Sequence, residues 1–298
     1  MLEPHPFSAI VKLPRDDQDP ASEPTAHGAL HWAPHHDPGF RARMSAIADW
    51  VARAQPEAVV VDVSVEVATF VRLLGIPVIV MALPGNRVDG PHQLVHRLAD
   101  HIVAAWPRQL CTPPWLQQYS NKTSYVGGIS RFEGRSRGPG ARPASPHTLR
   151  VLVLGGAGNE FGAAPEQSPE PAATWTRLGG DSGTWQADPW PAICAADVVV
   201  THAGQGCIAD VAAAQRPAVV IPQSRPFDEQ LSTATVLRRH QLAAVARRWP
   251  ESRAWPALLD HACAADTQRW TRWRVDGAAG RAAATIEATA QRCRRGAA

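Results

Sequence analysis

The feature that most constrains the fold is an alternation of short apolar runs with helical segments. The apolar run AVVVD (residues 58–62) predicts a buried parallel strand, and PVIVMAL (residues 77–83) predicts a second one. Between them a helix is predicted over residues 65–74, because Ser64 can cap its start and Gly75 can end it. Strands that alternate with helices in this way predict a parallel sheet with helical crossovers.

The alternation continues on both sides of this segment. An amphipathic helix is expected over residues 41–54, and another helix over residues 91–105. One further strand is expected over residues 9–13, within a stretch that is otherwise rich in Pro, His and Asp.

The pattern restarts in the second half, after a segment dense in Gly, Pro, Ser and Arg (residues 131–150) that is typical of a linker. Strands are predicted over residues 151–154, 197–201, 217–222 and 242–246, and helices over residues 189–195, 227–239, 251–264 and 278–294. We therefore predict an α/β protein with two doubly wound domains, over residues 1–132 and 149–298, joined by a linker over residues 133–148.

Composition limits the classes of protein to which the chain can belong. With 298 residues, 45% of them hydrophobic, it is long enough for two buried cores. Charged residues make up 19% and the net charge is +3, which argues against a disordered chain and against a nucleic-acid partner. Lys12 and Lys122 do not stand in a P-loop context, and the five cysteines form no C-x-x-C pair. Neither a signal peptide nor an apolar stretch long enough to span a membrane is found, so a cytoplasmic protein is expected.

Three loops follow predicted strands of the second domain, and ligands bind at that edge of a parallel sheet. THAGQG (residues 201–206) opens a helix that runs to residue 214. Its glycines allow close approach, and the helix start presents N–H groups to an anion such as a pyrophosphate. Asp210, one turn later, can accept hydrogen bonds from ribose hydroxyls, while GGAG (residues 155–158) and RPFDEQ (residues 225–230) offer close approach and polar groups. The candidate residues are Gly155, Gly156, Gly158, His202, Ala203, Gly204, Gln205, Gly206, Asp210, Asp228, Glu229 and Gln230.

Each loop also has a simpler interpretation, which the residues alone leave open. A glycine-rich turn between a strand and a helix is often only a tight connection. Asp210, Asp228 and Glu229 could likewise be solvated carboxylates that the helix dipole favours near a helix start. The equivalent position of all three loops in one domain favours a binding site.

The stretch ADVVVTHAGQGCIADVAAAQRPAVVIPQSRPFDEQLSTA (residues 196–234) resembles the C-terminal donor-binding domain of family 28 glycosyltransferases. That group includes the lipid-II-forming N-acetylglucosaminyltransferase and is related to the UDP-glycosyltransferases. VLVLGGAGNEF (residues 151–161) and TWQADPWPAICAAD (residues 184–197) resemble further segments of the same domain. The resemblance implies a GT-B-like fold, with two Rossmann-like domains that face a cleft and an incomplete N-terminal, acceptor-side domain.

The resemblance also implies an activity, the transfer of a hexose from a nucleotide sugar, with UDP as the nucleotide, to an unknown acceptor with inversion. By motif, residues 202–206 would hold the diphosphate, Asp210 the ribose, and Glu229 and Gln230 the sugar hydroxyls, with Asp228 as a neighbouring candidate. No metal and no cofactor is expected, because a helix start neutralises the leaving diphosphate. The acceptor could be a small molecule, a lipid or a glycan precursor.

The N-terminus departs from the family pattern. The family's acceptor domain opens with a strand and a Gly-x-Gly-His loop whose histidine is near the acceptor, and the first residues, MLEPHPFSAIVKLPRDD, contain neither. Either the given sequence starts late, or the opening strand, helix and base of the family are truly absent, in which case a partner chain could complete this domain. Asp62 and Glu66 are the substitutes considered for the unassigned general base, although carboxylates near a helix start are usually structural. A nucleotide-sugar-binding subunit without activity of its own and a sugar-nucleotide epimerase remain alternatives.

Three further features have two interpretations each. The histidines of HWAPHHD (residues 31–37) could bind zinc or nickel, but a loop near the acceptor cleft is favoured over a metal site. Trp185 or Trp190 could stack on the uracil base or belong to the core. The C-terminal arginines at residues 292, 294 and 295 could complement a helix dipole or make a peripheral membrane contact.

Overall fold

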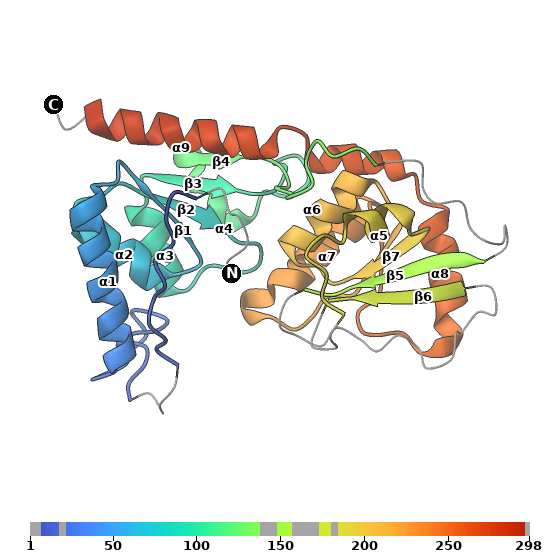
Figure 1. The fold of residues 1–298 in the computed structure, drawn as a ribbon, viewed down its shortest axis with the longest axis horizontal. Coiled ribbons are helices and arrows are strands. Elements are labelled where there is room, and N and C mark those ends of the chain that lie inside the picture. The colour runs from blue at the N-terminus through green and yellow to red at the C-terminus, as the bar shows by residue number, and fades with distance from the viewer. Residues whose placement is uncertain (1–6, 18–21, 138–147, 157–172, 180–183, 296–298) are drawn as a thin grey trace. The chain divides into compact units, whose positions relative to one another are not determined.

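The computed structural model describes residues 7–17, 22–137, 148–156, 173–179 and 184–295, whose strands form two sheets (Figure 1). The chain groups into two compact units. Unit 1 comprises Met1–Val80, Val88–His101 and Ala288–Ala298, and unit 2 comprises Met81–Arg87 and Ile102–Glu287. The α/β class predicted from the alternating pattern is confirmed. The predicted domain boundaries at residues 132/133 and 148/149 stay a prediction.

The first sheet has the strand order β1-β2-β3-β4. Its strands are β1 (Val59–Asp62), β2 (Val78–Ala82), β3 (His101–Ala104) and β4 (Thr123–Tyr125). The helices of this half are α1 (Pro38–Ala54), α2 (Val65–Leu73), α3 (Gly90–Leu98) and the short α4 (Pro114–Gln117), which precedes the 3-10 turn η1 (Ser120–Lys122). Ser64 caps α2 as predicted, since its hydroxyl accepts the Val67 N–H at 3.2 Å, and Gly75 follows the helix with φ +79°.

Three predictions for this half are wrong. Residues 9–13 form no strand, and three apolar side chains of this stretch are exposed. The helix predicted over residues 91–105 ends at Leu98, because Asp100 anchors the chain beside β2 and leads it into β3. Its N–H donates to the Val78 carbonyl at 2.8 Å and its carboxylate accepts the Val78 N–H at 2.8 Å. The strand predicted as buried over residues 58–62 is instead an edge strand, in which only Val61 is buried.

The second sheet has the order β6-β5-β7-β8-β9, and every pair in it is parallel. Its strands are β5 (Leu149–Leu154), β6 (Ala173–Leu178), β7 (Val198–Thr201), β8 (Ala218–Val220) and β9 (Ala244–Val245). The chain passes from β5 to β6 on one side of β5 and then continues with β7 on the other side. The adjacent ends of β5 and β7 therefore form a topological switch point, where parallel sheets bind their ligands.

The helices of the second half follow the predicted pattern. They are α5 (Trp190–Ala195), α6 (Gln205–Ala214), α7 (Glu229–Arg239), α8 (Trp255–Cys263) and α9 (Ala278–Arg295), with 3-10 turns η2 (Pro226–Asp228), η3 (Ser252–Ala254) and η4 (Thr267–Trp273). The sequence did not predict β6 or η4. β6 is an edge strand whose exposed side chains are Thr174 and Thr176, so it lacks the continuous apolar run of its neighbours.

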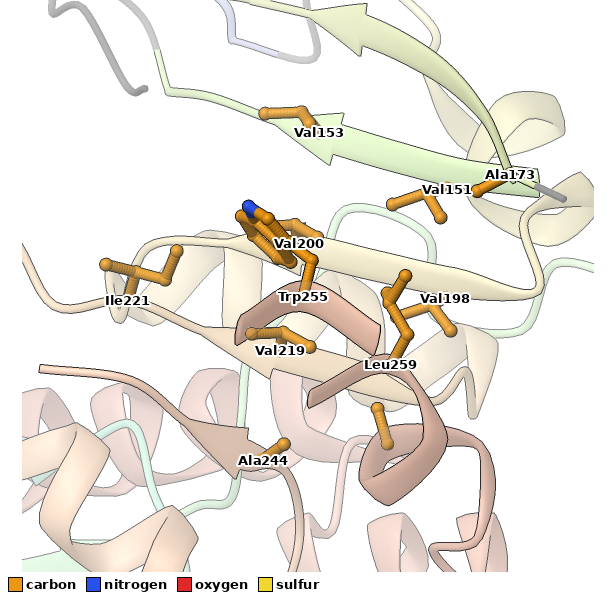
Figure 2. Close-up of a cluster of buried hydrophobic side chains, with 11 residues drawn as sticks. Val151, Val153, Ala173, Val198, Val200, Val219, Ile221, Ala244, Trp255 and Leu259 are labelled. Carbon is orange, nitrogen blue, oxygen red and sulfur yellow. The ribbon is translucent and has the colours of Figure 1, made fainter. Parts of the chain in front are cut away.

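A buried cluster holds the second sheet together (Figure 2). Inward-facing valines of β5, β7 and β8 pack against Trp255 and Leu259 of α8, which are 0% and 1% exposed. The Trp255 ring also meets Trp175 at 4.9 Å and Trp249 at 5.2 Å, both in edge-to-face geometry. Such aromatic pairs add about 0.5–1.5 kcal/mol beyond their buried area. This packing fixes the strand ends at which the predicted site lies.

Gly158 and most of the predicted linker lie outside the described residues. Within the part of the chain that the structure describes, no helix combines the length and the apolar character needed to cross a membrane.

Candidate active site

The start of α6 has main-chain N–H groups that the helix itself does not use. The first intrahelical bond runs from the Ile208 N–H to the Gly204 carbonyl at 3.0 Å. The N–H groups of Gln205, Gly206 and Cys207 come before it and have no partner inside the helix. Gly204 has no side chain with which to cap them. Such an open helix start suits an anion, and the anion site predicted from the THAGQG motif stays a prediction.

A cavity of about 370 Å³ lies at this helix start, and we call it the α6 cavity. It is lined by Leu154, Gly155, Gly156, Leu178, Gly179, Gly206, Cys207, Asp210, Ile129, Arg131, Trp185, Gln186 and Pro189, all in unit 2. The first eight come from the carboxyl ends of β5 and β6 and from α6, so the cavity occupies the switch point of the sheet. The structure thus brings together Gly155, Gly156, Gly206 and Asp210, which the sequence placed in two separate motifs.

The glycines around this cavity make room for His202. A Cβ atom on Gly156 would lie 2.9 Å from His202 Nε2, and one on Gly204 would lie 2.6 Å from His202 Cε1. Any side chain at either position would therefore displace the imidazole or the loop. The glycines serve the close packing of two loops as well as the open helix end.

His202 is held in its neutral form. Its Nδ1 accepts the Gly204 N–H at 2.9 Å, so Nε2 carries the hydrogen of the neutral ring and lies 3.5 Å from Cys207 Sγ. Burial of the ring, together with the charge of Arg225, lowers the pKa of His202 to about 4. At neutral pH the residue therefore acts as a buried hydrogen-bonding group and not as a cation.

Asp210 lies in the wall of the α6 cavity and is 7% exposed. Its Oδ1 accepts the Ser130 hydroxyl at 2.7 Å, and Arg131 Nε lies 3.8 Å from its Oδ2. Burial raises the pKa of Asp210, against the hydrogen bond from Ser130 and the charge of Arg131. Sequence reasoning missed Ser130, Arg131 and Gln186, because no local motif marks them.

The residues at the start of α7 serve mainly to join loops. Gln230 is 3% exposed, and its Oε1 accepts the N–H groups of Ala203 at 3.1 Å and of Gln223 at 2.9 Å. It thereby ties the loop after β7 to the segment after β8. Glu229 forms an ion pair with Arg87, with Oε2 and Nη2 3.1 Å apart.

The turn before α7 is strained. Phe227 and Asp228 are consecutive non-glycine residues with φ +62° and +54°, a conformation that costs on the order of 1–3 kcal/mol per residue. The Phe227 carbonyl accepts the Asn86 N–H at 2.8 Å, and Gly85 (φ +101°) packs so closely that a Cβ atom there would lie 2.2 Å from this carbonyl. Arg87 lies 4.6 Å from the Phe227 ring centroid and reinforces the turn.

A second cavity of about 550 Å³, the α7 cavity, also lies within unit 2. Its lining is largely apolar and includes Trp106, Leu110, Trp115, Leu231, Val236 and Trp273. Asp228 and Gln205 also line it, while the next residue, Gly206, lines the α6 cavity. The two cavities therefore adjoin at the first turn of α6.

The two carboxylates considered as general bases line neither cavity. Asp62 is exposed at the end of β1. Glu66 is 9% exposed and accepts the N–H groups of His31 at 2.8 Å and Trp32 at 3.0 Å, together with the Ser64 hydroxyl at 3.0 Å. Its carboxylate holds the segment before α1 in place.

The two tryptophans predicted near the base differ in their surroundings. Trp190 is 4% exposed, donates its indole N–H to the Ser136 carbonyl at 3.0 Å and packs against Phe132. Trp185 lines the α6 cavity and is 55% exposed. Only Trp185 is therefore placed to stack on a bound base.

Comparison with known proteins agrees with this geometry. Residues 188–253 match the glycosyltransferase family 28 C-terminal domain, and this segment contains β7, α6, β8 and α7. No curated protein matches the chain in sequence.

Solved structures extend the likeness to most of the chain. MurG of Acinetobacter baumannii is 16% identical, with 82% of this chain and 77% of that one covered and a TM-score of 0.52. The glycotransferase of kitacinnamycin is 17% identical, with 84% and 80% covered and a TM-score of 0.59. CalG4, the calicheamicin glycosyltransferase, is 19% identical, with 85% and 78% covered and a TM-score of 0.56.

At these identities the solved structures show the fold alone, and the family model matches residues 188–253. The chain has a GT-B fold, and its residues 188–253 match the family 28 C-terminal domain. The resemblance stated on residues 184–197 and 196–234 is confirmed within residues 188–253, and the predicted GT-B fold is confirmed.

Proposed function

We propose that the protein is a glycosyltransferase that moves a hexose from UDP-hexose to an acceptor hydroxyl, with inversion and without a metal or cofactor in the transfer step. The observation that carries the proposal is the α6 cavity at the switch point of the second sheet. Its floor is the uncapped start of α6, and its wall carries the carboxylate of Asp210.

Each part of the donor has a matching group in this cavity or at the helix start beside it. The N–H groups of Gln205, Gly206 and Cys207 would bind the diphosphate, and Arg131 adds positive charge beside them. Asp210 would accept hydrogen bonds from the ribose hydroxyls, sharing its carboxylate with Ser130. Trp185 would stack on the uracil.

The residues near the sugar would contact it through polar atoms that are not already used in contacts between loops. Gln230 uses its amide oxygen to hold two loops, and Glu229 is paired with Arg87. We propose that these two residues, with His202, shape the sugar subsite. The neutral His202 ring would offer hydrogen bonding without adding charge.

The transfer would be a single displacement. The acceptor oxygen attacks the anomeric carbon, the bond from that carbon to the diphosphate oxygen breaks, and the acceptor proton passes to a base. The negative charge that develops on the diphosphate would be stabilised at the α6 start, which is already oriented toward it. Single displacement at the anomeric carbon inverts its configuration.

The acceptor would occupy the α7 cavity, which adjoins the donor site at the first turn of α6. Its tryptophan, leucine and valine lining favours an acceptor with an apolar ring system or lipid portion next to the reacting hydroxyl. We therefore favour an apolar small molecule or a lipid over a free, fully polar glycan.

Calorimetric titration with UDP tests the donor site. The wild-type chain should bind UDP saturably, and Asp210→Ala should weaken binding by about 1–3 kcal/mol because the ribose loses its acceptor. Asp260→Ala is the matched control, an exposed carboxylate on α8 that lines neither cavity. A folded chain that does not bind UDP, or an Asp210→Ala variant with unchanged affinity, would refute the assignment. Titration with other nucleoside diphosphates then separates a wrong nucleotide from a wrong site.

One observation supports a second candidate function. Asp62 and Glu66, the carboxylates considered as bases, line neither cavity. A nucleotide-sugar-binding subunit that needs a partner chain for catalysis fits this arrangement. Product analysis separates the functions: a transferase releases UDP and forms a glycoside, an epimerase leaves the nucleotide attached to the sugar, and a binding subunit leaves the donor unchanged.

A further inference from the structure

A cluster of three side chains in unit 1 uses none of the residues that line the two cavities. His31 comes from the segment before α1, while Asp89 and His92 come from the start of α3. His31 Nε2 lies 2.7 Å from Asp89 Oδ2, and His92 Nδ1 is hydrogen-bonded to Asp89 Oδ1. The two imidazole centroids are 4.6 Å apart. We call these three residues the His–Asp–His cluster.

The position of Asp89 is unusual for an aspartate at a helix start. Asp89 is the N-cap residue of α3, yet its carboxylate makes no cap hydrogen bond. An N-cap aspartate normally accepts an N–H of the first turn, and this one directs both oxygens to imidazole nitrogens instead. The cluster therefore forms at the expense of the usual helix cap.

The backbone of His31 is held in place by a buried carboxylate. Glu66, at the start of α2, accepts the main-chain N–H groups of His31 and of Trp32. This fixes the backbone that carries the His31 ring, and it gives Glu66 a role other than the catalytic one considered from the sequence. The two imidazoles and the carboxylate come from the segment before α1 and the start of α3, and the start of α2 supports the first of these.

We propose that His31 Nε2, His92 Nδ1 and one oxygen of Asp89 bind a single Zn²⁺ ion, with water as the remaining ligand. The three atoms all lie within 4.8 Å of one another. Ligands on one zinc ion, with bonds of about 2.0–2.2 Å, are separated by up to about 4 Å, so small side-chain rotations suffice. Two imidazoles and a carboxylate form a donor set typical of zinc with an open position, and imidazole disfavours Mg²⁺ and Ca²⁺.

The exposure of the cluster suits such an ion. The side chains of His31 and Asp89 are 31% and 32% exposed, so an ion and its water can enter, while His92 is 8% exposed and forms the buried side. The bound ion would join the segment before α1 to the start of α3 and stabilise unit 1. This inference does not depend on the proposed transferase function.

Metal titration of the full chain tests the proposal. Protein stripped with a chelator and dialysed is titrated with ZnCl₂ by calorimetry, and with CoCl₂ by visible absorption. We expect one Zn²⁺ per chain, a Co²⁺ spectrum changed from that of the hydrated ion, and a rise in Tm on addition of zinc. A folded wild-type chain that binds no stoichiometric zinc would overturn the proposal, and the cluster would then be a hydrogen-bonded relay alone.

Variants assign the bound ion to this cluster. His31→Gln and Asp89→Asn should each lower zinc affinity at least about tenfold. His261→Gln, at an exposed position on α8, is the control and should leave it unchanged. Circular dichroism of the metal-free variants checks that they fold. Wild-type affinity in both folded variants would place the ion elsewhere and also overturn the proposal.

Discussion

The starts of α6 and α3 both lack the side-chain cap that usually accepts an N–H of the first helical turn. Both helices begin without a side-chain cap, but for opposite reasons. At α6 the cap residue is Gly204, so the first N–H groups stay open to a cavity and suit an anion. At α3 the cap residue is Asp89, whose carboxylate turns to two histidines and suits a cation.

The start of α2 shows the ordinary arrangement against which these two differ. Ser64 accepts the Val67 N–H, and its own hydroxyl donates to Glu66. The hydrogen-bonding capacity of this cap is used within the helix start. The comparison separates a helix start whose cap residue has no side chain, which suits an anion, from one whose cap carboxylate is directed elsewhere, which suits a cation.

The largest expected effect comes from giving α6 the negative charge that its start lacks. Gly206→Asp places a carboxylate in the first turn, where a Cβ atom meets nothing within 4 Å. UDP affinity should fall roughly 100-fold, about 3 kcal/mol, through repulsion of the diphosphate. The helix itself should not lose stability, because an acidic residue in the first turn is favourable. Calorimetry with UDP measures the first effect and urea denaturation the second.

Gly206→Asn is the isosteric neutral control for this variant. It should retain most of the UDP affinity. An equal loss in the two variants would mean that the added volume, and not the charge, blocks the site.

The second prediction concerns pH and the loop before α6. Because burial and Arg225 lower the pKa of His202 from 6.5 to about 4, the folded state keeps the ring neutral at a pH at which the unfolded state takes up a proton. The contribution of the neutral ring to the free energy of unfolding is fully present above pH 6.5. It is lost as the pH falls toward 4, which lowers the free energy of unfolding by about 3 kcal/mol in total. Urea denaturation at pH 7, 5.5 and 4.5 should show a smaller pH dependence for His202→Gln than for wild type.

The exposed His261 provides the control for this pH series. His261→Gln should reproduce the wild-type pH dependence. A His202→Gln variant whose stability falls as steeply as that of wild type would show that other groups cause the loss.

The smallest effect is expected at the ordinary cap. Ser64→Ala removes the acceptor of the Val67 N–H and should lower the free energy of unfolding by about 1 kcal/mol. It should leave UDP binding unchanged, since Ser64 lines neither the α6 nor the α7 cavity. Loss of UDP affinity in a variant as stable as predicted would contradict the separation of structural and ligand-binding helix starts.

Local patterns predicted most of the second half. The apolar runs of β5, β7 and β8 and the glycine-rich start of α6 are visible because the signal lies within a few residues. β6 was missed because an edge strand needs no continuous apolar run, and β3 was absorbed into a helix because its anchor, Asp100, acts on Val78 in another strand.

The residues of the candidate site also fall into those that a local sequence motif marks and those that no local motif marks. Gly206 and Asp210 were predicted because they share a helix with a recognisable start. Ser130 and Arg131 were missed because they stand some 80 residues before Asp210 in the chain. Glu229 was predicted as a sugar contact from its motif, whereas its pairing with Arg87, 142 residues away, is visible only in the structure.

By itself the sequence determined the alternation of strands and helices, the open start of α6 and the family resemblance, since each depends on neighbours within one or two turns. Only the tertiary structure decided that β5 and β7 meet at a switch point, that Asp210 faces Ser130, and that His31 joins Asp89 over 58 residues. The physical reason is that such contacts depend on how whole sheets and helices pack, which brings together side chains whose sequence positions carry no mutual signal.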